Sequence, residues 1–446
     1  MPQNIPHRTC STMGDSGGNP NINATTLPDP FADASHSIAT RVVHADNPMN
    51  SYSDVTPALH VSTTFRYPSD SDALRPTDDN DIPKRVPGAP ILGDTHIYSR
   101  LTAPNSSRLE LLLTSLLGAP CLTYSSGLAA FHALLVHINP RVVAIGDGYH
   151  GCHGVLTIFQ KLTHCRIVDL FDEKTWDNDA DGWSLGKGDV VHLESPVNPS
   201  GRAFNIAHFA ALAHKRGALL TIDATFAPPP LQDPFKWGAD YVMHSGTKYF
   251  GGHSDMLCGV IAVGKNRDTW EKEYWSMFGE RLHLGAVMGS LEGWLGVRSM
   301  RTYELRITRQ SENAQGIVSY LDSCLRGSQK DSRAEAVRNV VKGLEHASLQ
   351  EEDMSWLKEQ MPNGFGPVFA ISMKEATFAR RLPSKLHLFH HATSLGGAES
   401  LIEWRRMSDQ TVEDTLLRVS IGVESAKDLI EDLVAGFVAL AQEADA

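Results

Sequence analysis

The sequence has no basic run and no long apolar stretch. Its 446 residues contain 40 Lys and Arg against 52 Asp and Glu, a formal net charge of −12. Without a Lys/Arg-rich stripe to neutralise phosphates, nucleic acid is not an expected partner. No stretch approaches the roughly 18 apolar residues of a membrane span, and the first 35 residues lack the apolar core of a secretory signal. We therefore expect a cytoplasmic protein with no membrane partner.

Cysteine is also scarce. The six cysteines are scattered, with no CxxC pair and no regular framework, which is typical of thiols in a reducing compartment. Charged residues make up 21% of the chain and the AVILMFWYC set 41%, a balance typical of globular proteins. We expect a packed core, and not disulfides, to stabilise the fold.

The chain divides into four stretches. Residues 1–34 are rich in Asn, Ser, Thr, Gly and Pro, which predicts a disordered or loosely docked arm. Residues 35–95 form an N-terminal segment that contains a proline-rich, acidic insertion from 68 to 94. This insertion is a functional loop or a solvated insertion, and the second interpretation is favoured. We assign 96–300 to an α/β domain and 301–446 to a smaller C-terminal α+β domain.

The region from Asn105 onward alternates helical periods with short apolar runs. Asn105 is a candidate cap for a helix that ends at Gly118. The runs that follow predict seven strands of a mostly parallel sheet covered on both faces: Cys121–Tyr124, Val142–Ile145, Arg166–Leu170, Val190–Leu193, Leu219–Ile222, Tyr241–Met243 and Gly259–Val263. Further along, Val368–Ile371 and Leu417–Ile421 are predicted strands, and Ser425 caps a final helix.

The most informative segment is 244–255, HSGTKYFGGHSD, directly after a predicted buried strand. Lys248 then lies at the carboxyl end of a strand, where open α/β sheets place their ligands. The hydroxyls of Ser245 and Thr247 suit phosphate oxygens, and a desolvated lysine is a competent nucleophile for an aldehyde. A solvated loop lysine is the alternative interpretation.

Asp223 ends another apolar strand, 25 residues before Lys248 (248 − 223). A buried carboxylate needs a partner, and a protonated pyridine nitrogen is one that keeps it ionised. A lysine for the aldehyde and a carboxylate for the ring nitrogen are typical of pyridoxal 5'-phosphate (PLP) enzymes. A helix cap or an ordinary ion pair would also explain Asp223.

With these motifs the sequence resembles the Cys/Met-metabolism family of PLP enzymes, which includes cystathionine γ-synthase and the cystathionine lyases. The resemblance runs from about Thr40 to Leu433. It implies the PLP-dependent transferase fold of type I: an α/β architecture with a seven-stranded, mostly parallel sheet domain and a smaller C-terminal α+β domain. It also implies PLP as the cofactor, a homodimer as the catalytic unit and a homotetramer as the usual assembly.

The resemblance assigns roles residue by residue. It makes Lys248 the residue that binds PLP and shuttles protons, and Asp223 the partner of the ring nitrogen. Tyr149 stacks on the PLP ring. Asn198, in the motif ESPVNP that begins at Glu194, contacts the phenolic oxygen of PLP. The remaining cofactor ligands it implies are Ser126, Gly127, Leu128, Thr225, Ser245 and Thr247, together with Tyr98 and Arg100 from the neighbouring subunit.

The C-terminal motifs SLGGAES and LRVSIG match the substrate-carboxylate region. The resemblance makes Arg418 the carboxylate clamp; on its own, an arginine is more often part of a surface ion pair. The other substrate-binding residues it implies are Glu194, Thr393, Ser394 and Leu395. Although His150, Cys152 and His153 lie close together in the sequence, no remote ligand pair completes a metal site, and we predict none.

Two departures from the family pattern fall near the distal substrate pocket. Thr393 stands where γ-acting members commonly have Glu, and the stretch 404–409, WRRMSD, replaces the usual Pro-Ala-x-Met-Thr-His. The leading hypothesis is γ-replacement on O-acetyl- or O-succinylhomoserine by a thiol or a carbon nucleophile. The alternatives are β- or γ-elimination from cystathionine or methionine, and a non-catalytic scaffold. The nucleophile and the leaving group stay open.

Overall fold

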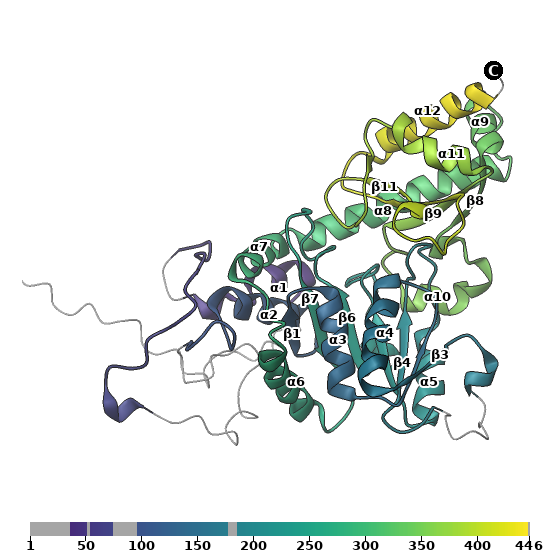
Figure 1. The fold of residues 1–446 in the computed structure, drawn as a ribbon. Helices are drawn as coiled ribbons and strands as arrows, with labels where there is room; N and C mark the ends of the chain where they lie inside the picture. The colour runs from purple at the N-terminus through teal and green to yellow at the C-terminus, as the bar shows by residue number, and fades with distance from the viewer. Residues whose placement is uncertain (1–35, 51–53, 75–95, 177–184, 445–446) are drawn as a thin grey trace, which may run out of the picture.

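The computed structural model describes residues 36–50, 54–74, 96–176 and 185–444. This part of the chain contains two sheets, each with its own helices, and the long helix α8 (Tyr303–Leu325) runs from one to the other (Figure 1). The predicted arm, 1–34, and all but the first residues of the predicted insertion, 68–94, lie outside the described residues.

The larger sheet has seven strands in the order β1-β7-β6-β5-β4-β2-β3. Neighbouring strands are parallel except where β7 pairs with β1 and with β6. The strands are β1 (Cys121–Tyr124), β2 (Val142–Ile145), β3 (Arg166–Asp169), β4 (Val190–Glu194), β5 (Leu219–Asp223), β6 (Tyr241–Ser245) and β7 (Gly259–Val263). All seven predicted strands are confirmed, with ends that differ by at most two residues.

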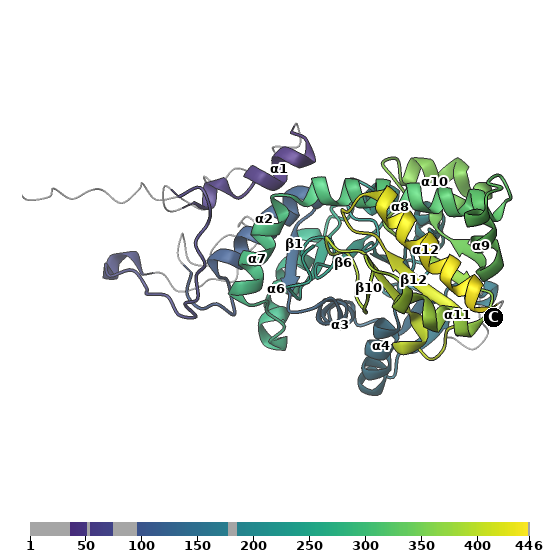
Figure 2. The same ribbon diagram turned by 90° about the horizontal axis from the view of Figure 1, so that it is seen from above.

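The apolar runs form strands because both faces of this sheet are covered. Successive residues of a strand point to opposite faces, and in β2 the side chains of Val142 and Ala144 join one buried cluster while Val143 and Ile145 join another. Helices lie on either side, as Figure 2 shows from above. They are α1 (Ile38–His44), α2 (Pro104–Leu117), α3 (Gly127–Ile138), α4 (His150–Thr163), α5 (Ile206–Lys215), α6 (Trp270–Leu284) and α7 (Ser290–Met300).

Asn105 does not cap α2. The helix begins at Pro104 after the N-cap Ala103, and proline suits the first position because its missing N–H would have no helical partner. The Asn105 side chain instead accepts a hydrogen bond from His60 N (2.9 Å) and donates one to Ala58 O (2.9 Å). These bonds fasten the segment 54–74 to the sheet domain. The predicted end of the helix is confirmed, because Gly118 has a φ of 67°.

The smaller sheet is mostly antiparallel, with the order β10-β11-β12-β9-β8. It packs on its own buried cluster, which the second half of α8 shares. The predicted strands near 368 and 417 and the cap Ser425 are confirmed. The elements are β8 (Val341–Glu345), β9 (Val368–Met373), β10 (His390–His391), β11 (Leu401–Trp404), β12 (Leu416–Ser420), α9 (Ser332–Val340), α10 (Met354–Gln360), α11 (Ala376–Arg381) and α12 (Ala426–Ala444).

This arrangement places one edge of the larger sheet against the smaller one. The parallel strands β2, β4, β5 and β6 have their carboxyl ends on the same edge. Ligands of open α/β sheets bind outside such an edge. A site is therefore expected there.

Candidate active site

A cavity of about 390 Å³ lies outside that edge. Its walls come from the loops after the parallel strands and from two segments of the smaller sheet domain, 393–395 and 405–418. The predicted site residues that line it are Ser126, Gly127, Leu128, Tyr149, Glu194, Asn198, Asp223, Thr225, Ser245, Thr247, Lys248, Thr393, Ser394, Leu395 and Arg418. Residues more than 290 positions apart in the sequence thus meet around one space.

Lys248 follows β6 and its side chain reaches across the cavity. Its Nζ donates a hydrogen bond to Ser394 Oγ (2.7 Å), and Ser394 has a φ of 74°, a conformation that residues with a side chain adopt rarely and mostly at functional sites. Burial lowers the pKa of Lys248 to about 8, and the charge of Arg418 acts in the same direction. About a tenth of the amine is therefore neutral at pH 7, far more than for an exposed lysine, and can attack an aldehyde.

Asp223 ends β5 in a buried position. Its Oδ1 accepts hydrogen bonds from Thr225 N (2.9 Å) and Thr225 Oγ1 (2.6 Å). Burial raises the pKa of Asp223, against the effect of these bonds and of the Lys248 charge. A cation placed beside this carboxylate would stabilise its ionised form, which is the relation expected for a protonated ring nitrogen.

The amino end of α3 forms a cradle for an anion. Ser126 caps the helix, accepting a hydrogen bond from Ala129 N (3.1 Å), so the positive end of the helix dipole faces the cavity. A Cβ on Gly127 would lie 3.2 Å from Ser245 Cβ and Oγ, so a larger residue would force Ser245 to shift by a few tenths of an ångström. Across the cradle, Thr247 Oγ1 lies 3.0 Å from Cys258 N, from which it accepts a hydrogen bond.

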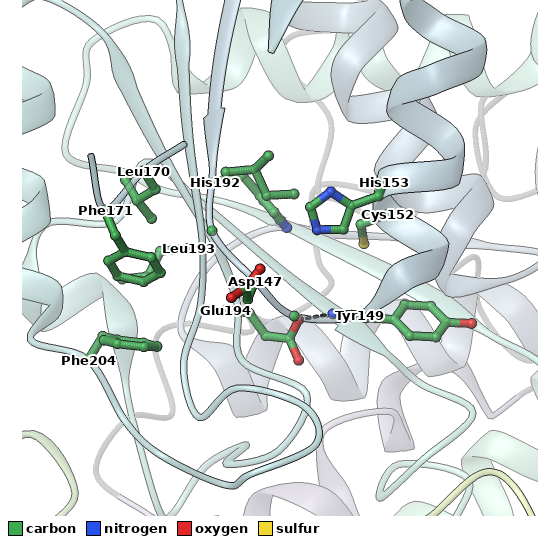
Figure 3. Close-up of a pocket in the computed structure, with 13 residues that line it drawn as sticks. Asp147, Tyr149, Cys152, His153, Leu170, Phe171, His192, Leu193, Glu194 and Phe204 are labelled. Carbon is green, nitrogen blue, oxygen red and sulfur yellow. Dashed lines mark hydrogen bonds between the residues drawn. The ribbon is translucent and has the colours of Figure 1, made fainter. Parts of the chain in front are cut away.

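Glu194 holds the loops that carry Tyr149 and Asn198. Its Oε2 accepts a hydrogen bond from Tyr149 N (2.7 Å), and its Oε1 accepts one from Asn198 N (2.6 Å). Figure 3 shows the first bond, with the Tyr149 ring pointing away from Phe171 and Phe204. Burial and then the charge of Asp223 raise the pKa of Glu194. Both carboxylate oxygens are engaged with backbone, and substrate binding by Glu194 stays a prediction.

Arg418 enters the cavity from β12. Its Nη2 forms an ion pair with Glu403 Oε2 (2.7 Å) and donates a hydrogen bond to Ser394 O (2.7 Å), and its Nη1 donates to Asn198 Oδ1 (3.3 Å). Burial lowers the pKa of Arg418 to about 10. The guanidinium therefore stays protonated at neutral pH and is available to a carboxylate.

Comparisons with known proteins agree with this geometry. The family model described as Cys/Met metabolism PLP-dependent enzyme matches residues 39–438. The chain belongs to this family. It is 31% identical to cystathionine gamma-synthase of Escherichia coli (strain K12) over 86% of this chain and 94% of that one. It is 30% identical to cystathionine gamma-lyase of Bacillus subtilis (strain 168), over 75% and 87%.

Among solved structures, one similar to this chain is a cystathionine gamma synthase from Xanthomonas oryzae pv. oryzae, in complex with aminoacrylate and cysteine. It superposes with a TM-score of 0.75 at 26% identity, covering 92% of this chain and 99% of that one. Enzymes of the Cys/Met metabolism family depend on PLP. The fold and the cofactor predicted from the sequence are therefore confirmed.

The cavity fits PLP by the chemistry of its donor groups. The cradle at α3 offers backbone amides and hydroxyls to a phosphate, the desolvated Asp223 suits a protonated ring nitrogen, and the partly neutral Lys248 suits the aldehyde. Tyr149 lines the same space with 37% of its surface exposed, so its ring is available for stacking. We propose these roles for the four groups.

The cavity also has walls that the sequence did not assign to a function. His150, Cys152, Phe226, Met243, Leu257, Arg405 and Ser408 line it. Arg405 and Ser408 fall in the stretch where the chain departs from the family pattern, and that departure is the signal that could have pointed to them. The part of the chain that the structure describes contains no group of three or more His, Cys, Asp or Glu side chains arranged to hold a metal.

Tyr98 and Arg100 do not line the cavity. They lie beside each other, with Arg100 Cζ 5.3 Å from the centroid of the Tyr98 ring, and Tyr98 pairs with Thr64 in an isolated bridge. Their contact with the phosphate of a neighbouring subunit stays a prediction. No helix within the described residues is long and apolar enough to cross a membrane.

Proposed function

We propose that this enzyme catalyses γ-replacement on an activated homoserine, such as O-acetyl- or O-succinylhomoserine, with a thiol or a carbon nucleophile. The observation that supports the reaction most directly is the meeting of Lys248, Asp223 and Arg418 around one cavity. The relatives include both reaction types, since a gamma-synthase matches over 94% of its length and a gamma-lyase over 96% of its own, so product analysis has to decide between replacement and elimination.

The residues of the cavity suit the successive demands of this reaction. When bound, PLP accepts the electrons left on the substrate as protons leave Cα and Cβ. Arg418 binds the α-carboxylate with its guanidinium fork. Lys248, hydrogen-bonded to Ser394, removes the Cα proton and returns it later. In the overall reaction the Cγ–O bond breaks, a Cγ–S or Cγ–C bond forms, and the proton of the nucleophile is transferred to the leaving acylate.

The charges around the cavity also bear on the nucleophile. Its carboxylates are Asp223 and Glu194, which are engaged with Thr225 and with two backbone amides, whereas Thr393 on the substrate side is neutral. The ammonium group of an incoming cysteine would meet Arg405 and Arg418 with no free carboxylate of the cavity to pair with. This favours anionic or uncharged nucleophiles, and we propose that cysteine is not the preferred one.

Product analysis tests the reaction. O-acetylhomoserine is incubated with purified holoenzyme and with cysteine, homocysteine, sulfide or a β-keto ester, and the products are identified by mass spectrometry. We expect a γ-substituted amino acid with at least one acceptor. If only an oxo acid and ammonia form with every acceptor, the enzyme is a cystathionine- or methionine-type lyase and the proposal is wrong.

We further propose that the enzyme acts in the cytoplasm as a homodimer or a dimer of dimers. The segment 54–74 carries apolar side chains that are largely exposed in the single chain, including Val55 (98%), Val61 (78%) and Tyr67 (61%). A neighbouring subunit would bury them, and Tyr98 and Arg100 lie in the same region. The cysteines in the described ranges are buried thiols, which is typical of a reducing compartment.

A further inference from the structure

Two buried arginines line the same cavity and share one carboxylate. Arg418 lies on β12, and Glu403 is its direct partner on β11. Arg405 follows β11 and is only 3% exposed. Glu403 Oε2 contacts Arg418 Nη2 at 2.7 Å and Arg405 Nη1 at 2.9 Å. Burial opposes the ionisation of Glu403, but Arg418 and other neighbours hold its pKa below its usual value.

Arg405 has donors that the described residues do not use. Its Nη1 donates to Glu403 Oε2 and to Ser408 Oγ (3.1 Å). Its Nε is buried with no hydrogen-bond partner among the described residues. Its Nη2 lies 3.9 Å from Asp409 Oδ2, beyond hydrogen-bond distance. An unpaired buried donor destabilises the protein, and an acceptor supplied by a ligand would remove that cost.

The two carboxylates paired with Arg405 do not line the cavity, and Glu194, which lines it and whose pKa the charge of Arg405 acts to lower, has both oxygens engaged with backbone amides. Neither Glu403 nor Asp409 is part of the lining, whereas Arg405, Ser408, Thr393 and Arg418 are. On this side a ligand therefore meets two guanidinium groups and neutral hydroxyls. Once Arg418 holds the α-carboxylate, Arg405 presents a second, separate site for an anion. A planar guanidinium favours a carboxylate because two parallel hydrogen bonds can form.

We propose that Arg405 binds a second carboxylate, at the distal end of a reaction partner of this enzyme. The inference rests on the proposed function and narrows its substrate class to compounds with an anionic group beyond the α-carboxylate. That group is the terminal carboxylate of a dicarboxylic acyl ester on homoserine, or a carboxylate on the incoming nucleophile. Both sources offer the same chemistry to Arg405.

Binding without turnover tests this directly. Holoenzyme is titrated with 2-aminoadipate and with norleucine, which differ in whether the side chain ends in a carboxylate or a methyl group, and binding is followed by the absorbance of the bound cofactor. We expect the wild type to bind 2-aminoadipate about tenfold or more tightly than norleucine, because a charge-assisted bidentate pair is lost with the methyl group. Equal affinities in the wild type would overturn the inference.

Variants then assign the preference to Arg405. In Arg405→Gln the ratio of the two affinities should fall to near one, because the distal carboxylate of 2-aminoadipate loses its partner. Arg405→Lys, which keeps the charge but not the fork, should retain part of the ratio. Arg406→Gln is the matched control, because Arg406 is exposed and donates to Gln410 O and Val412 O. A preference that survives in both Arg405 variants would contradict the inference.

Turnover distinguishes the two sources of the carboxylate. One arm compares O-succinylhomoserine with O-acetylhomoserine, and the other compares 3-mercaptopropanoate with its methyl ester as the nucleophile. In one arm we expect a higher kcat/KM for the compound with the carboxylate. The difference should arise from a lower KM and should be lost in Arg405→Gln. No preference in either arm would overturn the inference while leaving γ-replacement intact. A wild type that forms no replacement product, yet binds 2-aminoadipate through Arg405, would contradict the proposed function alone.

Discussion

The Lys248 amine has a lowered pKa because of where its charged neighbours lie. Burial and then the charge of Arg418 lower the pKa to about 8, against the opposing effects of Glu403 and Asp223. Since only the neutral amine attacks an aldehyde, the rate at which apoenzyme binds PLP should rise with pH to a plateau, with a midpoint near 8. Stopped-flow absorbance between pH 6 and 9.5 measures it.

Two variants test the direction in which neighbouring charges shift this midpoint. Arg418→Gln removes a positive charge and should move the midpoint up, whereas Asp223→Asn removes a negative charge and should move it down. Because free PLP ionises in the same way in every experiment, it does not contribute to the difference between the midpoints of a variant and the wild type. Midpoints that both move in one direction, or that do not move, would show that these charges do not control the pKa of Lys248.

Glu194 should make the stability of the apoenzyme pH-dependent. Burial and Asp223 raise its pKa above the ordinary value of 4.5, so the native state retains a proton that the unfolded state has lost. The stabilising contribution is full below that value and is lost as pH rises through the raised pKa. Glu194→Gln, which does not titrate, should therefore gain stability relative to wild type between pH 5 and 8.

Relative to wild type, the free energy of unfolding of Glu194→Gln should increase by on the order of 1 kcal/mol per pH unit between pH 5 and 8. Thermal unfolding of the two apoenzymes at several pH values measures it as a widening difference in Tm. The constant difference between Gln and Glu as hydrogen-bond acceptors is visible at pH 5 and serves as the baseline. A difference in Tm that is flat across this range would mean that Glu194 is ionised in the native state.

Among the elements, α3 carries the most demanding local geometry. A Cβ on Gly127 would press on Ser245 at 3.2 Å, so Gly127→Ala should open the anion cradle and weaken PLP binding by about tenfold, the effect of about 1.4 kcal/mol. Equilibrium binding of PLP to the apoenzyme measures this change.

Gly154→Ala in α4 provides the control. Its Cβ would meet nothing within 4 Å, and alanine favours a helix by up to about 1 kcal/mol over glycine. We expect unchanged PLP affinity and equal or higher stability in this variant. Similar losses of affinity in both variants would mean that the close approach at Gly127 does not matter.

The elements of the larger sheet were predictable because both of its faces are buried. Runs such as Val142–Ile145 are apolar at every position, and glycines or helical periods bound them. The strand order was not predictable, since the antiparallel β7 between β1 and β6 depends on tertiary packing. Asn105 was misassigned for the same reason: its partners, His60 and Ala58, lie 45 and 47 residues away.

For the whole molecule, the site is built from two sheets that α8 connects. The first half of α8 packs in the core of the larger sheet through Ile307, and the second half packs under the smaller sheet through Ile317 and Leu321. The family pattern predicted the motif residues that meet around the cavity, and their roles toward PLP stay predictions. The arrangement of Glu403 between Arg405 and Arg418 was not, because it requires the register of β11 with β12.

Assembly should be visible in mixed variants. Arg100 lies outside the cavity, and we predict that it completes the site of a neighbouring subunit. Arg100→Ala and Lys248→Ala should each be nearly inactive as pure proteins. In hybrid dimers one of the two sites is intact, so mixing after subunit exchange should restore up to about a quarter of wild-type activity. Exchange demonstrated by native mass spectrometry without any rescue would indicate that each site comes from one chain.

The account depends most on the assignment of Lys248 as the residue that holds PLP. Reduction of the holoenzyme with borohydride, followed by peptide mapping by mass spectrometry, tests it directly. We predict one pyridoxyl group per chain, on Lys248, and none in a folded Lys248→Ala variant, which should also lose the yellow colour and the activity. A pyridoxyl group on another lysine, or full activity in a protein that contains no PLP, would contradict the account.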